Sequence, residues 1–264
     1  MCFDNAVCGH HRGVVRVVIR PARRLTTAGL LVMISLVLSA CGGGSPTASQ
    51  TPSSTRAGPT TIGATQISGP VQGAALVQAL RAGGLLLWMR HTERDTRSGT
   101  VTPEQAASHD CAAQSMLTTT GRQHATQIGA ALRALHLPIA AVHTGRLCRT
   151  EETGQLLNIA PVTDDDRLDA SSTWAHRGGA MAEQRATLQV LSEPPPAGKD
   201  LMLISSALDI PHAQPDVLRN LGPGETAVFR PGPPGNATLL ARIGESAWPT
   251  LLQTTTTTPA TSTR

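Results

Sequence analysis

The residues best suited to chemistry lie in two short basic segments. Arg90 and His91 follow the apolar run 85–89, and Arg149 lies in the segment 143–153 that follows the apolar run 139–142. Two guanidinium groups can hold a phosphate through charge-assisted, often bidentate hydrogen bonds. An imidazole beside them can attack phosphorus and form a covalent intermediate that water then hydrolyses. These residue types therefore predict a site for binding and transferring a phosphoryl group.

The elements that must position these residues follow an alternating pattern. Continuous apolar runs bounded by turn residues are typical of strands that are buried on both faces of a parallel sheet. Their alternation with helical segments predicts an α/β fold, a three-layer sandwich with a mostly parallel central sheet. Ligands of such sheets bind beyond the carboxyl ends of the strands, so the two basic segments are expected to meet there. The expected strands are 85–89, 139–142, 201–204, 227–229 and 238–242, and the expected helices are 74–82, 121–135, 151–157 and 182–191.

Four motifs, in order along the chain, resemble those of the histidine phosphatase superfamily, which includes phosphoglycerate mutases and small phosphohistidine phosphatases. Residues 85–94 resemble the strand that ends in Arg-His-Gly, with Thr92 in the place of the glycine. Residues 117–125 resemble Leu-Thr-x-x-Gly-Arg-x-Gln-Ala, 148–153 resemble the Arg-Thr-x-Glu-Thr segment, and 224–231 resemble the closing strand. Each motif alone is a weak signal, but the four together, each on its expected element, indicate a phosphoglycerate mutase-like fold.

The resemblance also implies roles for individual residues. It makes His91 the nucleophile and makes Arg90 and Arg149 the ligands of the phosphoryl group. Arg94 is a candidate third ligand, and a solvated surface arginine is at least as good an interpretation of it. The general acid is expected at Asp169, which follows an acidic run at 164–166, and Glu93 is the second choice.

One departure from the family pattern bears on catalysis. Ser206 stands where the family has a second catalytic histidine, so it is a candidate phosphate ligand without a positive charge. Losing a donor aimed at developing charge commonly costs about 2.7–4 kcal/mol, or roughly 10²–10³ in rate. Arg146, in a place where the family often has proline, is a candidate to restore charge. Two interpretations stay open: weak hydrolysis of a phosphomonoester or phosphohistidine through His91, and a catalytically impaired pseudophosphatase that binds a phosphate ligand or a partner.

The first 40 residues predict a lipoprotein signal peptide. An apolar run of 13 residues, 28–40, follows Arg20, Arg23 and Arg24, and it ends in Leu-Ser-Ala before Cys41. This resembles a lipobox, in which the cysteine receives lipid that holds the protein at a membrane. The glycines that follow Cys41 fit, by resemblance, an outer-membrane anchor on the periplasmic side of a cell envelope. The expected division is 1–40 signal peptide, 41–71 lipidated cysteine and flexible tether, 72–250 folded domain and 251–264 disordered tail.

The charge balance and the aromatic content of the chain indicate which classes of partner to expect. From Cys41 onward the chain has 17 Lys and Arg against 17 Asp and Glu, and it has only five aromatic residues in all, which argues against nucleic acid. The expected partner is a phosphorylated small molecule or a phosphoprotein, and no cofactor is predicted. Cys111 and Cys148 are expected to form a disulfide, as an even pair in an exported protein. A Cys/His zinc site is the less favoured alternative because no CxxC spacing exists.

Overall fold

The computed structural model describes residues 66–96, 102, 104–105, 108–206 and 216–256. The predicted signal peptide, Cys41 and most of the predicted tether lie outside these residues, as does the end of the predicted tail. Among the described residues, none of the helices has both the length and the apolar composition needed to cross a membrane.

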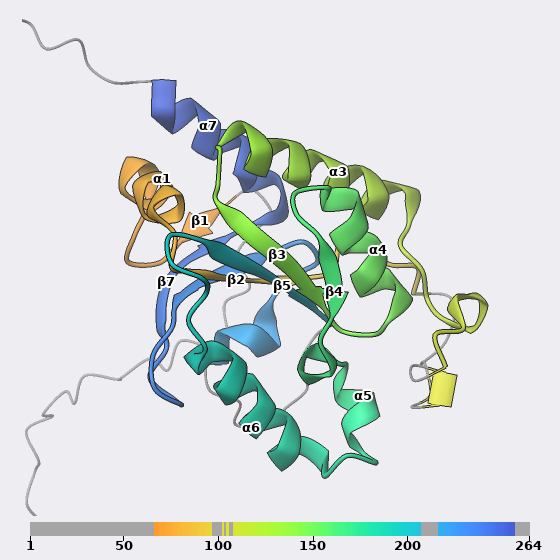
Figure 1. Ribbon diagram of the computed structural model, residues 1–264. Helices are drawn as coiled ribbons and strands as arrows, with labels where there is room; N and C mark the ends of the chain where they lie inside the picture. Colours follow the sequence, from red (N-terminus) through yellow and green to blue (C-terminus); the bar gives the residue numbers. More distant parts are fainter. Residues whose placement is uncertain (1–65, 97–101, 103, 106–107, 207–215, 257–264) are drawn as a thin grey trace, which may run out of the picture. The chain divides into compact units, whose positions relative to one another are not determined.

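Seven strands form one mixed sheet in the order β1-β7-β6-β2-β5-β3-β4 (Figure 1). The pairs β2–β5, β5–β3 and β3–β4 are parallel, whereas β2–β6, β6–β7 and β7–β1 are antiparallel. All strands except β1 and β6 therefore run in the same direction, and their carboxyl ends share one edge. The strands are β1 (Ile67–Ser68), β2 (Leu86–Arg90), β3 (Ile139–Thr144), β4 (Val162–Asp164), β5 (Asp200–Ser205), β6 (Thr226–Arg230) and β7 (Thr238–Ile243).

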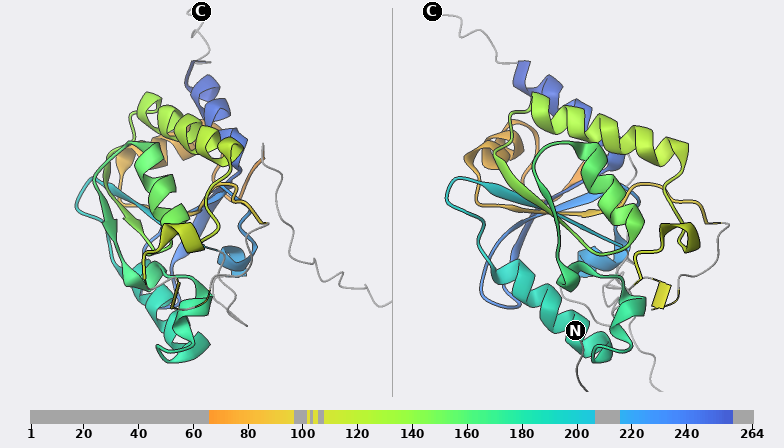
Figure 2. Two further views of the ribbon diagram at one scale, coloured as in Figure 1. Left: turned by 90° about the vertical axis from the view of Figure 1, so that its right-hand side faces the viewer. Right: turned by 45° about the vertical axis from the view of Figure 1, so that its right-hand side comes forward.

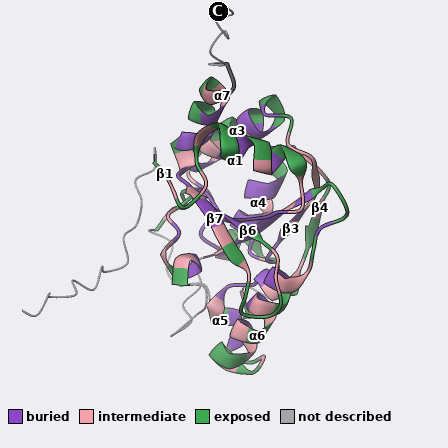
Figure 3. Cartoon of the chain, turned by 90° about the vertical axis from the view of Figure 1, so that its left-hand side faces the viewer, coloured by how far each residue is buried: buried purple, intermediate pink, exposed green. Residues whose placement is uncertain are grey.

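Helices cover both faces of this sheet and make the predicted three-layer sandwich. In Figure 2, α3 and α4 lie on one side of the sheet and α6 on the other. Residues that are buried gather on the strands and on the inner sides of the helices (Figure 3). The helices are α1 (Gly73–Ala82), α3 (Thr119–Ala134), α4 (Cys148–Leu157), α5 (Ser171–Trp174), α6 (Gly179–Ser192) and α7 (Trp248–Thr256), with short 3-10 turns η1 (Cys111–Ala113), η2 (Asp166–Leu168), η3 (Asp216–Asn220) and η4 (Glu245–Ala247).

Strand β2 explains why the central strands are continuously apolar. Successive side chains of a strand point to opposite faces of the sheet. Leu87 and Met89 accordingly belong to the core beneath α1, α3, α4 and α7, whereas Leu86 and Trp88 belong to the core beneath α6 and η3. Because both faces are covered, every position of the strand must be apolar until Arg90, where the chain reaches the open edge.

The folded part extends beyond the range 72–250. β1 lies within the segment predicted as a tether, and it pairs with β7 through Ile67 and Ile243. α7 continues to Thr256, because Trp248 and Leu251 are fully buried in the core below α1 and α3. Both elements are short. β1 follows a Ser- and Thr-rich stretch and α7 runs into a Thr-rich stretch, so their few core residues do not stand out in the composition.

Candidate functional site

His91 is held by backbone hydrogen bonds at the carboxyl end of β2. Its N–H donates to the carbonyl of Ser205 on β5 at 3.0 Å, and its own carbonyl accepts from Gly224 N at 3.1 Å. The N–H of Arg90 donates to the carbonyl of Glu225 at 3.1 Å, which fixes the preceding residue in the same way. The side chain of His91 is almost completely buried. The backbone therefore leaves the imidazole little freedom.

The two nitrogens of the His91 ring have different partners. Nδ1 lies 2.7 Å from the carbonyl oxygen of Thr92, which can only accept, so Nδ1 carries the proton. Nε2 accepts a hydrogen bond from Arg149 Nε at 3.0 Å. Burial, and then the charge of Arg149, lower the pKa of His91 well below 6.5. The imidazole is therefore neutral at physiological pH, and its lone pair lies on Nε2, facing the guanidinium group.

Buried Arg149 and partly buried Arg90 both have hydrogen-bond donors without acceptors. Arg149 lies in the first turn of α4 and is 6% exposed, and Arg90 is the last residue of β2. Arg90 Nη1 donates to Leu221 O at 2.9 Å, but Arg90 Nε and Arg149 Nη1 have no acceptor among the described residues. Burial and neighbouring arginines lower the pKa of Arg90, and they lower that of Arg149 to about 10. An oxyanion bound here would accept hydrogen bonds from these unsatisfied donors and offset the repulsion between the cations.

Ser206 and Arg94 complete the group. Arg149 Nη2 donates to Ser206 Oγ at 3.2 Å, just beyond the end of β5. Arg94 is partly buried, its Nη1 lies 3.4 Å from the carbonyl of Asp95, and its charge contributes to the lowered pKa of Arg149 and of Arg90. The structure thus brings Arg90, His91, Arg149 and Ser206 together, with Arg94 close enough to add to their positive field. We call these five residues the His91 cluster.

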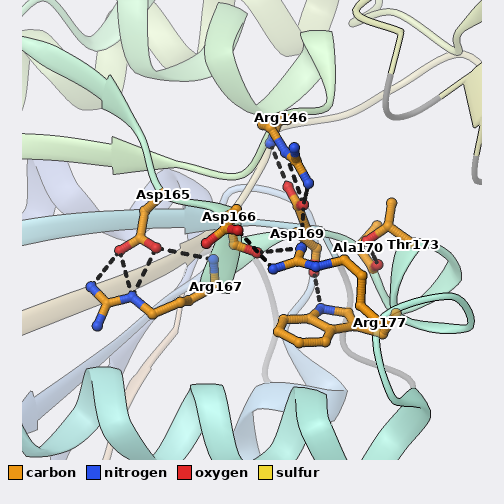
Figure 4. Close-up of polar contacts among 9 residues, drawn as sticks. Arg146, Asp165, Asp166, Arg167, Asp169, Ala170, Thr173 and Arg177 are labelled. Atoms are coloured by element: carbon orange, nitrogen blue, oxygen red, sulfur yellow. Dashed lines mark hydrogen bonds and ion pairs between the residues drawn. The ribbon is translucent and has the colours of Figure 1, made fainter.

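Asp169 lies in a separate network of ion pairs (Figure 4). Its carboxylate accepts from the backbone N–H of Arg146 at 2.9 Å and from the side chain of the same residue, and it also accepts from Arg177 Nη1 at 2.9 Å. The guanidinium of Arg177 in turn lies 4.2 Å from the ring centroid of Trp174. Asp169 is 2% exposed, so this network anchors the β3–α4 loop to η2. Both oxygens of this carboxylate are thus engaged by Arg146 and Arg177.

The second candidate acid, Glu93, is exposed. Its Oε1 accepts from Thr118 Oγ1 at 3.2 Å, and its backbone carbonyl accepts from Thr118 N at 3.0 Å. Among the described residues, neither Glu93 nor Asp169 shares a hydrogen bond with His91, Arg90 or Arg149. No described carboxylate is hydrogen-bonded to His91, Arg90 or Arg149, so these contacts single out no general acid.

Two residues near the cluster had no role in the sequence analysis. Glu225 is buried and accepts from Gly222 N at 2.7 Å and from Arg242 Nε at 2.7 Å. Burial raises the pKa of Glu225, and its charge partly offsets the lowered pKa of Arg90. Gln114 is 4% exposed and its Oε1 accepts from Cys148 N at 3.0 Å. Buried polar residues of this kind leave no periodic signal in the sequence.

The two cysteines singled out in the sequence form a disulfide in the structure. The Cα atoms of Cys111 and Cys148 are 5.6 Å apart, and 37 positions separate the two residues along the chain. Cys148 is the first residue of α4 and directly precedes Arg149. Among the described residues, no group of His, Cys, Asp and Glu side chains could hold a metal ion.

Comparison with known proteins gives matches among solved structures only. No family model and no curated protein matches the chain. The protein histidine phosphatase SixA, complexed with tungstate, is 17% identical, with 61% of this chain and 97% of that chain covered at a TM-score of 0.41. A phosphoserine phosphatase mutant from Entamoeba histolytica, in complex with phosphoserine, is 12% identical, with 62% and 98% covered at 0.42. Phosphoglycerate mutase from Plasmodium falciparum is 14% identical, with 59% and 87% covered at 0.34. All three likenesses lie below 25% identity and below a TM-score of 0.5.

Proposed function

We propose that this chain hydrolyses a phosphomonoester or a phosphohistidine, carried by a small molecule or a protein, through a phosphohistidine formed on His91. The observation that carries the proposal is the tautomer of the ring. Nδ1–H donates to the Thr92 carbonyl, so the lone pair of Nε2 lies beside the buried guanidinium of Arg149. A neutral imidazole with a fixed lone pair, next to donors without acceptors, is suited to attack a bound phosphoryl group.

The reaction has two steps on this reading. Arg90 and Arg149 hold the phosphoryl oxygens, and Arg149 Nε transfers its hydrogen bond from Nε2 of His91 to one of these oxygens. The freed lone pair of Nε2 then attacks phosphorus while the bond to the leaving group breaks. The leaving group takes its proton from solvent, because no described carboxylate is hydrogen-bonded in the cluster. Water then attacks the phosphorus of the phosphohistidine, which releases inorganic phosphate and returns the neutral imidazole. The arginines stabilise the negative charge in both steps.

Hydrolysis of an aryl phosphate by the full chain tests this mechanism. We expect turnover by the wild type and a radiolabelled, acid-labile phosphoenzyme after rapid quenching. His91→Ala should abolish both signals. His176→Ala is the matched control, because the side chain of His176 is 71% exposed and lies 3.8 Å from the carboxylate of Glu104. Turnover that is the same in His91→Ala and His176→Ala would exclude a phosphohistidine on His91.

A pseudophosphatase that binds a phosphate ligand is the second candidate, and Ser206 favours it. Its hydroxyl accepts from Arg149, so this position adds no positive charge to the cluster. On this reading the wild type binds inorganic phosphate but turns over no aryl phosphate, whereas Ser206→His creates activity. Wild-type turnover that depends on His91 would exclude this second candidate.

We also propose that the mature protein is anchored to a membrane through lipid on Cys41, on the periplasmic side of a cell envelope. The support is the apolar run 28–40 that ends in Leu-Ser-Ala before the cysteine. Two acyl chains supply stable anchoring because each buried methylene contributes about 0.8 kcal/mol. Cys41→Ala should move the protein from the membrane fraction to the soluble fraction and abolish labelling by a fatty-acid analogue. Retention of Cys41→Ala in membranes would argue against the anchor.

A further inference from the structure

The disulfide reaches the His91 cluster through a single peptide bond. Cys148 is 3% exposed and opens α4, and Arg149 follows it with a side chain that donates to His91 Nε2 and to Ser206 Oγ. Cys111, at the other end of the disulfide, is exposed and belongs to η1. One sulfur of the bond therefore lies next to an anion ligand, and the other belongs to an exposed residue.

A hydrogen bond of Gln114 also links the segment around Cys111 to the start of α4. Its Oε1 accepts from the N–H of Cys148 at 3.0 Å, and its Nε2 donates to the carbonyl of Gln105 at 3.2 Å. The first N–H groups of a helix have no partner inside the helix, so this side chain satisfies one of them. The start of α4 is thus fixed by a covalent bond and a buried hydrogen bond, both from the segment 111–114.

Arg149 needs such anchoring because its surroundings repel it. Burial and the charges of Arg94 and Arg90 lower its pKa to about 10, which means that the site disfavours the charged guanidinium. A long arginine side chain also loses rotamer freedom when it is held in one geometry. Without an anion, the cluster would relax if Arg149 moved towards solvent. A fixed backbone at Cys148 opposes that movement.

We propose that the Cys111–Cys148 disulfide and Gln114 position Arg149 for anion binding, so that a dithiol reductant weakens the site. This inference rests on the proposed function, in which Arg149 is the phosphate ligand. A thiolate of the dithiol attacks Sγ of Cys111 and displaces Cys148 as a thiol. The second thiol of the reductant then releases Cys111 and closes to a disulfide. Two electrons and two protons pass from the reductant to the two cysteines.

Calorimetric titration of the full chain with inorganic phosphate, with and without dithiothreitol and well below the unfolding temperature, tests the proposal. We expect the affinity to fall at least about tenfold on reduction, the equivalent of losing about one charged hydrogen bond. Cys111→Ala should bind phosphate weakly in both conditions, which separates this disulfide from the other cysteines of the chain. Gln114→Leu should weaken binding several-fold, and Gln114→Glu, which keeps an acceptor oxygen, should restore it. Hydrogen exchange at residues 148–153 should speed up on reduction.

Three results would overturn the proposal, and they are distinguishable. If reduction lowers the melting temperature but leaves the phosphate affinity unchanged, the disulfide stabilises the fold and does not position Arg149, while the proposed function stands. If Gln114→Leu and Gln114→Glu bind equally, Gln114 has no positioning role. If the oxidised wild type binds no phosphate, the proposed function fails, and the positioning role fails with it.

Discussion

Two arginine-rich clusters, one around His91 and one around Asp169, shift the pKa of their guanidinium groups in opposite directions. In the His91 cluster, burial and then the charge of Arg94 lower the pKa of Arg90 and of Arg149. In the network around Asp169, the hydrogen bond to that carboxylate raises the pKa of Arg146 (Figure 4). Next to it, hydrogen bonds to Asp165 and Glu193 raise the pKa of Arg167 in the same way. Among the described residues, Arg90 and Arg149 have no hydrogen bond to a carboxylate, whereas Arg146 and Arg177 are hydrogen-bonded to Asp169.

The difference separates arginines that are held for a ligand from arginines that hold the fold. A buried cation without a partner costs stability, and an anion that binds there recovers the cost. An arginine paired with Asp169 stabilises the local structure, and its donors are used within the protein instead of on a ligand. Four predictions test this comparison, and the first sets a variant in one cluster against a control in the other.

Arg149→Met carries the largest expected effect. Met keeps the apolar stem but removes the donors, so hydrolysis should fall roughly 10²–10³-fold, as for the loss of a donor to developing charge. The melting temperature should stay the same or rise, because a buried repulsive charge is gone. Arg177→Met is the control: it should lower the melting temperature and leave phosphate affinity unchanged. A stability loss in Arg149→Met as large as that in Arg177→Met would erase the contrast between the clusters.

Asp169→Asn should lower the stability and leave phosphate binding nearly unchanged, the reverse of Arg149→Met. The amide oxygen can still accept from Arg146 N, but Arg146 and Arg177 lose the charge that they share. We expect the free energy of unfolding in urea to fall by about 2–3 kcal/mol, because breaking a largely buried ion pair from one side is costly. The phosphate affinity should change less than about threefold. If hydrolysis disappears while the stability is unchanged, Asp169 is the general acid after all.

Ser205→Ala probes a neutral bond behind the cluster, where a smaller effect is expected. Trp88 Nε1 donates to Ser205 Oγ at 2.8 Å, and Ser205 Oγ donates to the carbonyl of Ser206 at 2.9 Å. The change leaves a buried N–H without a partner and should cost about 1–2 kcal/mol of stability and a few-fold in phosphate affinity. Ser192→Ala, which removes only a hydroxyl bonded to Gln189 O, should change neither.

The sequence predicted the parts of the fold that depend on local pattern. Apolar runs such as 85–89 are long enough to identify a strand, and the residues at their ends could then be placed at one edge. β4 has three residues, none of them buried, and α5 has four, so neither has a period to detect. The Thr-rich composition at the end of α7 led to the prediction of a disordered tail from 251, although Leu251 is fully buried by tertiary packing.

The site divides in the same way. Arg90, His91 and Arg149 could be named because they end or follow recognisable elements, and Cys111 and Cys148 because they were the two cysteines left. The pairing of Asp169 with Arg146 could not be predicted from the sequence, because 23 positions separate the two residues and other arginines of the chain were equally plausible partners. Gln114 escaped for the same reason: its partner is a backbone N–H 34 positions away.

The smallest expected effect is a pH dependence that comes from His91. Its pKa is lowered in the folded chain and returns to about 6.5 on unfolding, so the unfolded chain takes up the proton first as the pH falls. The contribution of His91 to stability is therefore present above pH 6.5 and is lost as the pH falls below it, by about 1 kcal/mol near pH 5.5.

Burial raises the pKa of Asp200 to about 7, which changes the stability in the opposite direction over the same pH range. We therefore expect the effect in the difference between urea unfolding of the wild type and of His91→Gln, where Asp200 cancels. In an Arg149→Met background the difference should shrink but persist, because burial is the larger cause and repulsion the smaller. A difference that is flat from pH 7.5 to 5.5 would mean that the imidazole of the folded chain takes up its proton as readily as in water, and the neutral nucleophile would be lost.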